Sequence, residues 1–509
     1  MATWYVRPDT SHNTTRNGTS YATAWGGWGE VVAGSMAATD TLMICGAHSY
    51  SDAAKVTHKT GTSTSARFVY DGGYAADPGS IAFSGSAYLV ANNSNVSIRN
   101  LTITGKGVYH NANKINVDYT GCEFYGGASG VSFDTSTGGV ITGITFDSCD
   151  FHDFTGIGSN GAISLLISAT GASYTATGWT ITGCTFRDCT ASDNVIHIRS
   201  ESDTTAVSFG DITISGCSFE DCRGSPIRIV NDAGTPTNGA VTVTDNIFTN
   251  CTQQSSGNGG NQIYGTAITI SGNTLNGVHG AGGGFNVFYG SGVVIEDNHI
   301  EDITTSTIDG NGILIDHGND NVTIRRNTIK NCTGKSGVSN SGCGVMILDS
   351  TNVQVYGNTI EGGRIGLWMD QANGKTQSAQ IHHNTVVDPT VYGMYIGQYA
   401  TRAAIVAKNN VFTGSVPFVY DQTTGGWTGE DYNVVYGMTA STNHTDGAHN
   451  ITSDPVLTAD FKPSSASPCV GAGVYTLPGV TDYRGLAFRH DAPTIGAFEM
   501  NPKVLIQAP

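Results

Sequence analysis

The sequence predicts an all-β solenoid in which short parallel strands stack as successive rungs, and two observations predict it. The first is a repeat, present in residues 322–329 (VTIRRNTI), 353–360 (VQVYGNTI) and 379–386 (AQIHHNTV). Each copy is an alternating strand followed by Asn and another apolar residue. Alternation at period two places one face of a strand in the core. Recurrence every 25–35 residues indicates a stacked coil and not a row of independent domains.

The second observation is a ladder of Asn residues at one position of successive repeats. Its members are Asn246, Asn273, Asn298, Asn327, Asn358, Asn384 and Asn410. In earlier repeats the same position holds Leu101, Cys122, Cys149, Cys184 and Cys217. Equivalent residues stack at a spacing of ~4.8 Å, where amide side chains can hydrogen-bond along the stack. We therefore expect the Asn side chains to be buried.

Length and composition agree with a solenoid. A generic chain of 509 residues would form two or three domains, but a solenoid grows rung by rung without that limit. Hydrophobic residues make up 39% of the chain and are periodic, which argues against disorder. The net charge of −17 argues against nucleic acid as a partner. No apolar run approaches the ~20 residues of a membrane span, so we expect no membrane partner.

The eleven cysteines are expected to be free and buried. Several fall on the ladder position, and a second column follows five residues later: Cys189, Cys222, Cys251 and Cys332. A spacing of five differs from the two to four residues of zinc sites. Free Cys behaves as a small hydrophobe, and many unpaired thiols favour folding in a reducing compartment.

These repeats resemble the right-handed parallel β-helix superfamily, which is pectate-lyase-like. The resemblance implies a single-stranded parallel β-helix of about twelve rungs. The opening strand, WYVRPD from Trp4, resembles the N-terminal cap of bacterial and phage β-helix proteins, above all phage tailspikes and tail-associated depolymerases. The segments DYRG (482–485) and IGAFE (495–499) resemble the end cap that follows many such helices.

The expected organisation has three parts. Residues 1–90 form the N-terminal cap and first coils, with a short aromatic helix within 21–32. Residues 91–415 form the parallel β-helix that carries the polysaccharide-binding face, and residues 416–509 form the C-terminal capping region. His444 and His449 are expected in a solvated loop.

The outer face of one strand per rung is the expected site of function. Aligning inward apolar pairs across the repeats predicts an outward stripe of side chains. Its members are Tyr109, Ser132, His197, Arg228, Asn286, Leu314, Met346, Trp368 and Tyr395. A long stripe of parallel strands suits an extended polymer, and Trp368 and Tyr395 are expected to bind substrate by stacking on sugars; scattered surface aromatics are the alternative.

An acidic group on this stripe is the predicted catalytic site. Asp316 and Asp370 occupy equivalent positions two rungs apart, at roughly 9–10 Å, and Asp349 follows the strand between them. Inverting glycosidases place two carboxyl groups ~6.5–9.5 Å apart. The alternatives are ordinary turn residues or a structural calcium site; no other metal or cofactor is expected.

A basic group is the second predicted site. His197 and Arg199 share a strand, and Arg228 lies on the next rung. These residues suit binding of an acidic sugar, or a lyase with a base and a cation for the uronate carboxylate. The alternative is charge compensation by nearby carboxylates. The signature residues of pectin hydrolases and of calcium-dependent pectate lyases are absent from the sequence.

Three functions follow as expectations. The favoured one is a tailspike-type depolymerase of the phage virion, an endo-glycosidase that cleaves a cell-surface polysaccharide as a homotrimer. The second is a secreted lyase, hydrolase or epimerase of the same fold, whose signal peptide has been removed. The third is a non-catalytic receptor-binding protein. The absence of a secretory signal after Met1 favours the first.

Overall fold

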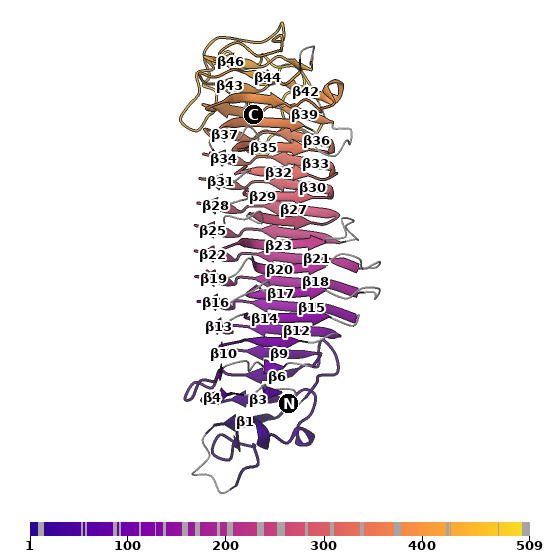
Figure 1. Cartoon of the computed structure of the whole chain (residues 1–509), viewed down its shortest axis with the longest axis vertical. Helices are drawn as coiled ribbons and strands as arrows, with labels where there is room; N and C mark the ends of the chain where they lie inside the picture. The colour runs from indigo at the N-terminus through magenta and orange to yellow at the C-terminus, as the bar shows by residue number, and fades with distance from the viewer. Residues whose placement is uncertain are drawn as a thin grey trace, which may run out of the picture. The chain divides into compact units, whose positions relative to one another are not determined.

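The computed structural model describes residues 1–8, 15–51, 54–55, 59–84, 89–90, 93–110, 113–127, 129–135, 139–154, 161–167, 174–190, 194–200, 207–231, 239–251, 260–279, 283–305, 310–335, 341–370, 378–423, 427, 429–476 and 478–500. The chain forms two compact units, residues 1–252 and 253–509, which are described separately. Each unit is a parallel β-helix built from three parallel sheets, named A, B and C (Figure 1).

In the first unit, neighbouring rungs pair in parallel within each sheet. Its sheet A contains β1 (Thr3–Arg7), β2 (Trp25–Gly26), β3 (Thr41–Ile44), β6 (Phe68–Asp71), β9 (Val96–Arg99), β12 (Lys114–Thr120), β15 (Gly139–Asp147), β18 (Tyr174–Thr182), β21 (Val207–Ser215) and β24 (Ala240–Thr244). Its sheet B contains β4 (Ala47–Tyr50), β7 (Ser80–Phe83), β10 (Thr102–Thr104), β13 (Glu123–Tyr125), β16 (Asp150–His152), β19 (Thr185–Arg187), β22 (Ser218–Glu220) and β25 (Ile247–Thr249). Its sheet C contains β5 (Ala54–Lys55), β8 (Leu89–Val90), β11 (Val108–His110), β14 (Val131–Thr135), β17 (Ile163–Ile167), β20 (Asn194–Ser200) and β23 (Ser225–Asn231).

The second unit repeats the same plan. Its sheet A contains β27 (Ala267–Ser271), β30 (Ser291–Glu296), β33 (Asp320–Arg325), β36 (Thr351–Tyr356), β39 (Ala379–His382), β42 (Ile405–Lys408) and β45 (Glu430–Asp431). Its sheet B contains β28 (Thr274–Asn276), β31 (His299–Glu301), β34 (Thr328–Lys330), β37 (Thr359–Glu361), β40 (Thr385–Val387), β43 (Val411–Thr413) and β46 (Val434–Tyr436). Its sheet C contains β26 (Asn261–Tyr264), β29 (Phe285–Phe288), β32 (Ile313–Asp316), β35 (Cys343–Leu348), β38 (Ile365–Asp370), β41 (Tyr392–Ile396) and β44 (Val419–Asp421).

The coils extend beyond the twelve rungs expected within residues 91–415. Among the described residues, sheet B has eight strands in the first unit and seven in the second. Strands β4 and β7 precede the expected range and β46 follows it. The coils before residue 91 are the first coils expected within residues 1–90, whereas β46 lies in the expected capping region.

The Asn ladder is confirmed, and the structure shows what it does. The ladder residues are at most 2% exposed and lie at the corner between sheets A and B. Asn327 is typical: its Nδ2 donates to the carbonyls of Ile295 and Arg325 and to Oδ1 of Asn358. Its backbone N–H donates to the same Oδ1, at 3.0 Å. Backbone N–H and C=O groups at the corner lose their hydrogen-bond partners in the sheets, and the ladder side chains supply partners in their place.

The ladder extends beyond its expected end to Asn433 and then to Asn450, whose Oδ1 accepts from the backbone N–H of Asn433 at 2.9 Å. Asn433 accepts from the backbone N–H of Asn410 at 2.8 Å. The corner residue before each Asn has a positive φ, for example 57° at Asp297 and 56° at Arg326, so the chain turns there in the left-handed region.

The cysteine prediction is also confirmed, since all eleven cysteines are free and buried. The sequence reasoning missed a stack of phenylalanines inside sheet B of the first unit. Its members are Phe124, Phe151, Phe186, Phe219 and Phe248. Successive ring centroids lie 4.7–5.0 Å apart with nearly parallel planes, so the rings follow the rung spacing. Each Phe follows a ladder residue by two positions, a signal that was present in the sequence.

The short helix expected within residues 21–32 is present only as a 3₁₀ turn. That segment forms β2 and the 3₁₀ turn η1 (Trp28–Glu30), and η2 (Ala33–Ser35) follows. A run of three residues is too short to form an α-helix. The Trp28 side chain is fixed by its burial, at 6% exposed. With η3 (Arg402–Ala404), these are the helical elements of the described chain, and none of them is long and apolar enough to cross a membrane.

The C-terminal segment does more than close the end of the second unit. It runs along the flank of the coils, where Tyr483 Oη meets Thr328 Oγ1 at 2.7 Å and the N–H of Ala497 donates to Thr385 Oγ1 at 2.9 Å. The solvated loop expected for His444 is wrong, because its side chain is fully buried beside Glu430. His449 is exposed, as expected.

Candidate functional site

The outward stripe lies on the outer face of sheet C, in the register that the sequence predicted. In the second unit the stripe is Leu314, Met346, Trp368, Tyr395 and Tyr420 on five adjacent strands. In the first unit it is Tyr109, Ser132, Ser164, His197 and Arg228. The predicted stripe lacks Ser164 and Gln262, because the apolar pairs on their strands are less regular than in the other repeats.

The aromatic residues of the stripe are less accessible than expected. Trp368 is 4% exposed and Tyr395 is 6% exposed, so the expectation of two open stacking surfaces is corrected. Their ring centroids lie 4.0 Å apart, and Tyr395 stacks on Tyr420 at 5.1 Å. Wide rings on adjacent strands cover one another at the rung spacing. We call Trp368, Tyr395 and Tyr420 the aromatic ladder.

The solvent-accessible aromatic surface is supplied by neighbours of this ladder. Tyr392 and Tyr420 are half-buried, and Tyr399 is 62% exposed. The Nε1–H of Trp368 is buried and has no hydrogen-bond partner among the described residues. Buried indole N–H groups usually have one, and no described residue supplies an acceptor to this donor.

Glycines on neighbouring rungs, Gly344 and Gly366, let sheet C approach sheet B closely beneath this face. A Cβ at Gly344 would lie 2.6 Å from the Ile360 side chain, and one at Gly366 would lie 2.5 Å from Val386. Only glycine fits this close approach of sheets B and C. Cys343 and Ile365, one residue earlier, pack with the aromatic ladder in a single apolar cluster.

The structure brings Asp316 and Asp349 together with His317, a residue that the sequence reasoning had not selected. One ligand atom of each lies within 4.8 Å of the others. Asp316 is 9% exposed and Asp349 is fully buried. Asp316 Oδ1 accepts from the backbone N–H of His317 at 2.6 Å and lies 3.0 Å from its Nδ1. His317 and Asp349 both have positive φ, at the ends of adjacent sheet C strands.

Asp370 pairs in register with Leu348, and Asp316 directly follows Ile315, which pairs with Ile347 of the same strand as Leu348. The Oδ1 of Asp370 accepts from the backbone N–H of Tyr399 at 3.2 Å. Its carboxyl group occupies the space that a Cβ at Gly397 would need. Burial, together with Tyr420, Asp370 and Tyr392, raises the pKa of Tyr395 to about 12, so this hydroxyl remains a donor at neutral pH.

The predicted basic residues meet on the outer face of the first unit. His197 pairs in register with Ser164 on one side and Arg228 on the other. Arg199 lies opposite Val230. His197 is only 2% exposed, and both arginines are half-buried.

Three groups among the described residues have the composition of a metal site. They are Asp316 with His317 and Asp349, Glu123 with Asp150 and His152, and Glu430 with His444 and Asp446. Each offers two carboxylates and one imidazole, which suits a hard or borderline divalent cation. None of the three offers the thiolate or thioether ligands preferred by copper(I).

Comparisons with known proteins agree with the fold. The family model described as "Right handed beta helix region" matches residues 165–342, and the one described as "Periplasmic copper-binding protein (NosD)" matches residues 263–444. The chain has a right-handed parallel β-helix fold. No curated protein matches it significantly.

Solved structures similar to the chain include three polysaccharide-active proteins. A mannuronic acid specific polysaccharide family 6 lyase from human gut microbiota is 12% identical, over 78% of this chain and 86% of that one, with a TM-score of 0.43. A pectate lyase is 12% identical over 98% and 97%, with a TM-score of 0.22. The A-module of a mannuronan C-5 epimerase from Azotobacter vinelandii is 15% identical over 81% and 89%, with a TM-score of 0.23. At these values the similarity carries no argument about activity.

Proposed function

We propose that the protein binds an extended polysaccharide along the outer face of sheet C in the second unit and hydrolyses it there. One observation carries the proposal: adjacent strands bring carboxylates to the same face as the aromatic ladder, where Trp368 presents a buried N–H with no partner among the described residues. The half-buried tyrosines beside Trp368, Tyr392 and Tyr420, offer apolar ring surface to the C–H groups of a sugar.

Asp316 and Asp349 are the pair best placed for chemistry. Retaining glycosidases hold their two carboxyl groups ~5–5.5 Å apart, one as nucleophile and one as acid and base. Oxygen atoms of Asp316 and Asp349 lie within 4.8 Å, which is closer to this geometry than to the inverting geometry expected for Asp316 and Asp370. Asp370, beside Tyr395, is then assigned to substrate binding.

The test is a set of Asp-to-Asn variants assayed against capsular and lipopolysaccharide glycans. Asp316→Asn and Asp349→Asn should keep polymer binding and lower the release of reducing ends by at least ~10²-fold. Asp388→Asn is the matched control, because Asp388 also has a positive φ in the second unit and is exposed. Full activity in both site variants would refute the assignment.

The same assay separates the alternatives. A lyase or epimerase acting on a uronate polymer is supported by the register of His197 with Arg228, a base beside a cation. It would be indicated by unsaturated products or inverted uronates, and by loss of activity in His197→Ala. Binding without any product would indicate a receptor-binding protein.

We also propose, as the setting for this activity, a tail-associated depolymerase of a phage virion. The free buried cysteines and the WYVRPD opening support it. Light scattering tests it, because a tailspike is expected to be a homotrimer and a secreted enzyme a monomer.

A further inference from the structure

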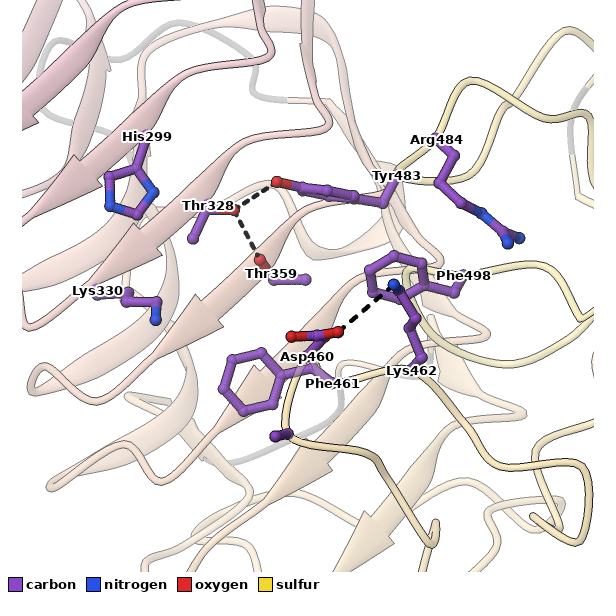
Figure 2. Close-up of a pocket in the computed structure, with 11 residues that line it drawn as sticks. His299, Thr328, Lys330, Thr359, Asp460, Phe461, Lys462, Tyr483, Arg484 and Phe498 are labelled. Carbon is purple, nitrogen blue, oxygen red and sulfur yellow. Dashed lines mark hydrogen bonds and ion pairs between the residues drawn. The ribbon is translucent and has the colours of Figure 1, made fainter.

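A second cavity lies within the second unit, away from sheet C. It has a volume of about 340 Å³ and opens between the outer face of sheet B and the C-terminal segment (Figure 2). Strands β31, β34 and β37 supply His299, Thr328, Lys330 and Thr359. The volume falls at the lower end of the ~300–1,000 Å³ typical of ligand pockets, which suits one or two sugar rings.

Three hydroxyl groups at the centre of the cavity leave one donor unused. Thr359 donates to Thr328 Oγ1 at 3.3 Å, and Thr328 and Tyr483 share a hydrogen bond of 2.7 Å (Figure 2). These three groups carry three protons but form only two hydrogen bonds with one another. Whichever of Thr328 and Tyr483 donates, the other keeps a proton with no acceptor among the described residues. An oxygen-rich ligand would accept it.

The cavity is lined by three cations, Lys330, Lys462 and Arg484, and by one carboxylate, Asp460, in a protein whose net charge is −17. Lys330 lies 3.1 Å from Glu361, and Lys462 lies 3.6 Å from Asp460; all four side chains are partly exposed, so these ion pairs are weak. The ammonium groups can therefore turn toward a ligand.

Arg484 is held more firmly than the lysines. Its Nε and Nη2 donate to Asp482 Oδ2 at 2.9 and 2.6 Å, and Asp482 is fully buried. Its Nη1 has no hydrogen-bond partner among the described residues. A fixed guanidinium with a free N–H group is suited to a carboxylate.

An aromatic wall completes the cavity. Phe498 lies beneath both cations of the C-terminal segment, 5.5 Å from Lys462 Nζ and 5.9 Å from Arg484 Cζ. Its ring centroid is 5.1 Å from that of Tyr483. Phe461 lines the same cavity (Figure 2). Phe498 is 2% exposed, so the accessible ring surface comes from the half-buried Phe461 and Tyr483. Such surface next to cations and hydroxyl donors matches a sugar that carries a carboxylate better than it matches a small inorganic anion.

We propose that this cavity binds a uronic acid residue, with the carboxylate at Lys462 and Arg484 and a ring hydroxyl at Tyr483 and Thr328. The site is separate from the face assigned to hydrolysis and does not depend on that assignment. It would hold an acidic sugar, either as part of a longer chain or alone.

The test is isothermal titration calorimetry of the full chain with glucuronate, with methyl glucoside as the neutral sugar and sulfate as the small anion. Glucuronate should bind saturably, more tightly than either comparison ligand, and more weakly at high salt. Lys462→Gln should weaken glucuronate binding about 10-fold, because a charge-assisted contact is lost. Tyr483→Phe, which keeps the ring on Phe498, should weaken it about 5-fold.

A control variant makes the outcome decisive. Lys408→Gln removes a cation of β42 outside the cavity and should bind glucuronate like the wild type. Failure of the hydrolysis proposal would leave this result unchanged, because the cavity contains none of the residues assigned to hydrolysis. Equal binding by Lys462→Gln and the wild type, no saturable binding of glucuronate, or equal affinity for sulfate or methyl glucoside would overturn the proposal.

Discussion

Replacing Asn358 by alanine probes the ladder at a rung whose contacts are fully defined. The side chain makes five hydrogen bonds. Its Oδ1 accepts from the N–H and from Nδ2 of Asn327, at 3.0 and 2.9 Å. Its Nδ2 donates to the carbonyls of Ile324 and Tyr356, at 2.9 and 3.2 Å, and to Asn384 Oδ1 at 2.9 Å.

The expected loss of stability in Asn358→Ala depends on which hydrogen bonds the neighbouring residues retain. Asn327 Nδ2 still has the Ile295 and Arg325 carbonyls, and Asn384 Oδ1 still has the N–H of residue 358. The backbone N–H of Asn327 loses its acceptor and stays buried, which costs ~1–3 kcal/mol. With the weakened carbonyl contacts, we expect the free energy of unfolding to fall by about 3 kcal/mol.

Urea unfolding followed by circular dichroism measures this change, and hydrogen exchange at the Asn327 amide shows whether it is local. Asn276→Ala is the control, because Asn276 is exposed in the strand β28 and should change stability by less than ~0.5 kcal/mol. Asn358→Asp should be worse than alanine at neutral pH, since an oxygen then faces two carbonyl groups. A loss below ~0.5 kcal/mol in Asn358→Ala would refute the hydrogen-bond account of the ladder.

Three further predictions concern other parts of the chain. Intact-mass measurement after alkylation in denaturant, without reduction, should show all eleven cysteines modified; a protected pair would contradict the free thiols. Gly397→Ala should displace the Asp370 carboxyl group and weaken polymer binding as much as Asp370→Ala does, and normal binding by the glycine variant would exclude a role for that carboxylate. Burial lowers the pKa of His382 to about 4 and that of His383 to about 3. The unfolded chain therefore binds more protons below pH 6.5, and unfolding free energy should fall by about 4 kcal/mol between pH 8 and pH 5, measured by urea titration, with about half of this dependence lost in His383→Gln.

Much of the fold followed from local spacing. A ladder Asn, the strand before it and the apolar residue after it lie within eight residues, so their repetition is visible without knowledge of contacts. Alternation then gives the outward register, and the structure confirms it from Leu314 to Tyr395. The phenylalanine stack had an equally local signal, because each Phe keeps a fixed distance from its ladder residue.

The candidate sites depended on contacts that spacing does not encode. The sequence places Trp368 on the outer face, but its burial depends on how Met346 and Tyr395 pack beside it. The approach of Asp349 to Asp316 depends on left-handed turns at the ends of two strands.

By itself, then, the sequence determined a parallel solenoid, its buried Asn and Cys ladders and the residues on each face, because periodicity directly reports which side chains point inward. Only the tertiary structure decided which outward residues are covered, which carboxylates meet, and that the C-terminal segment forms a cavity on sheet B through Tyr483 and Thr328. Those residues are 155 positions apart in the chain. Contacts at such separation arise from the packing of whole elements, and no local period records them.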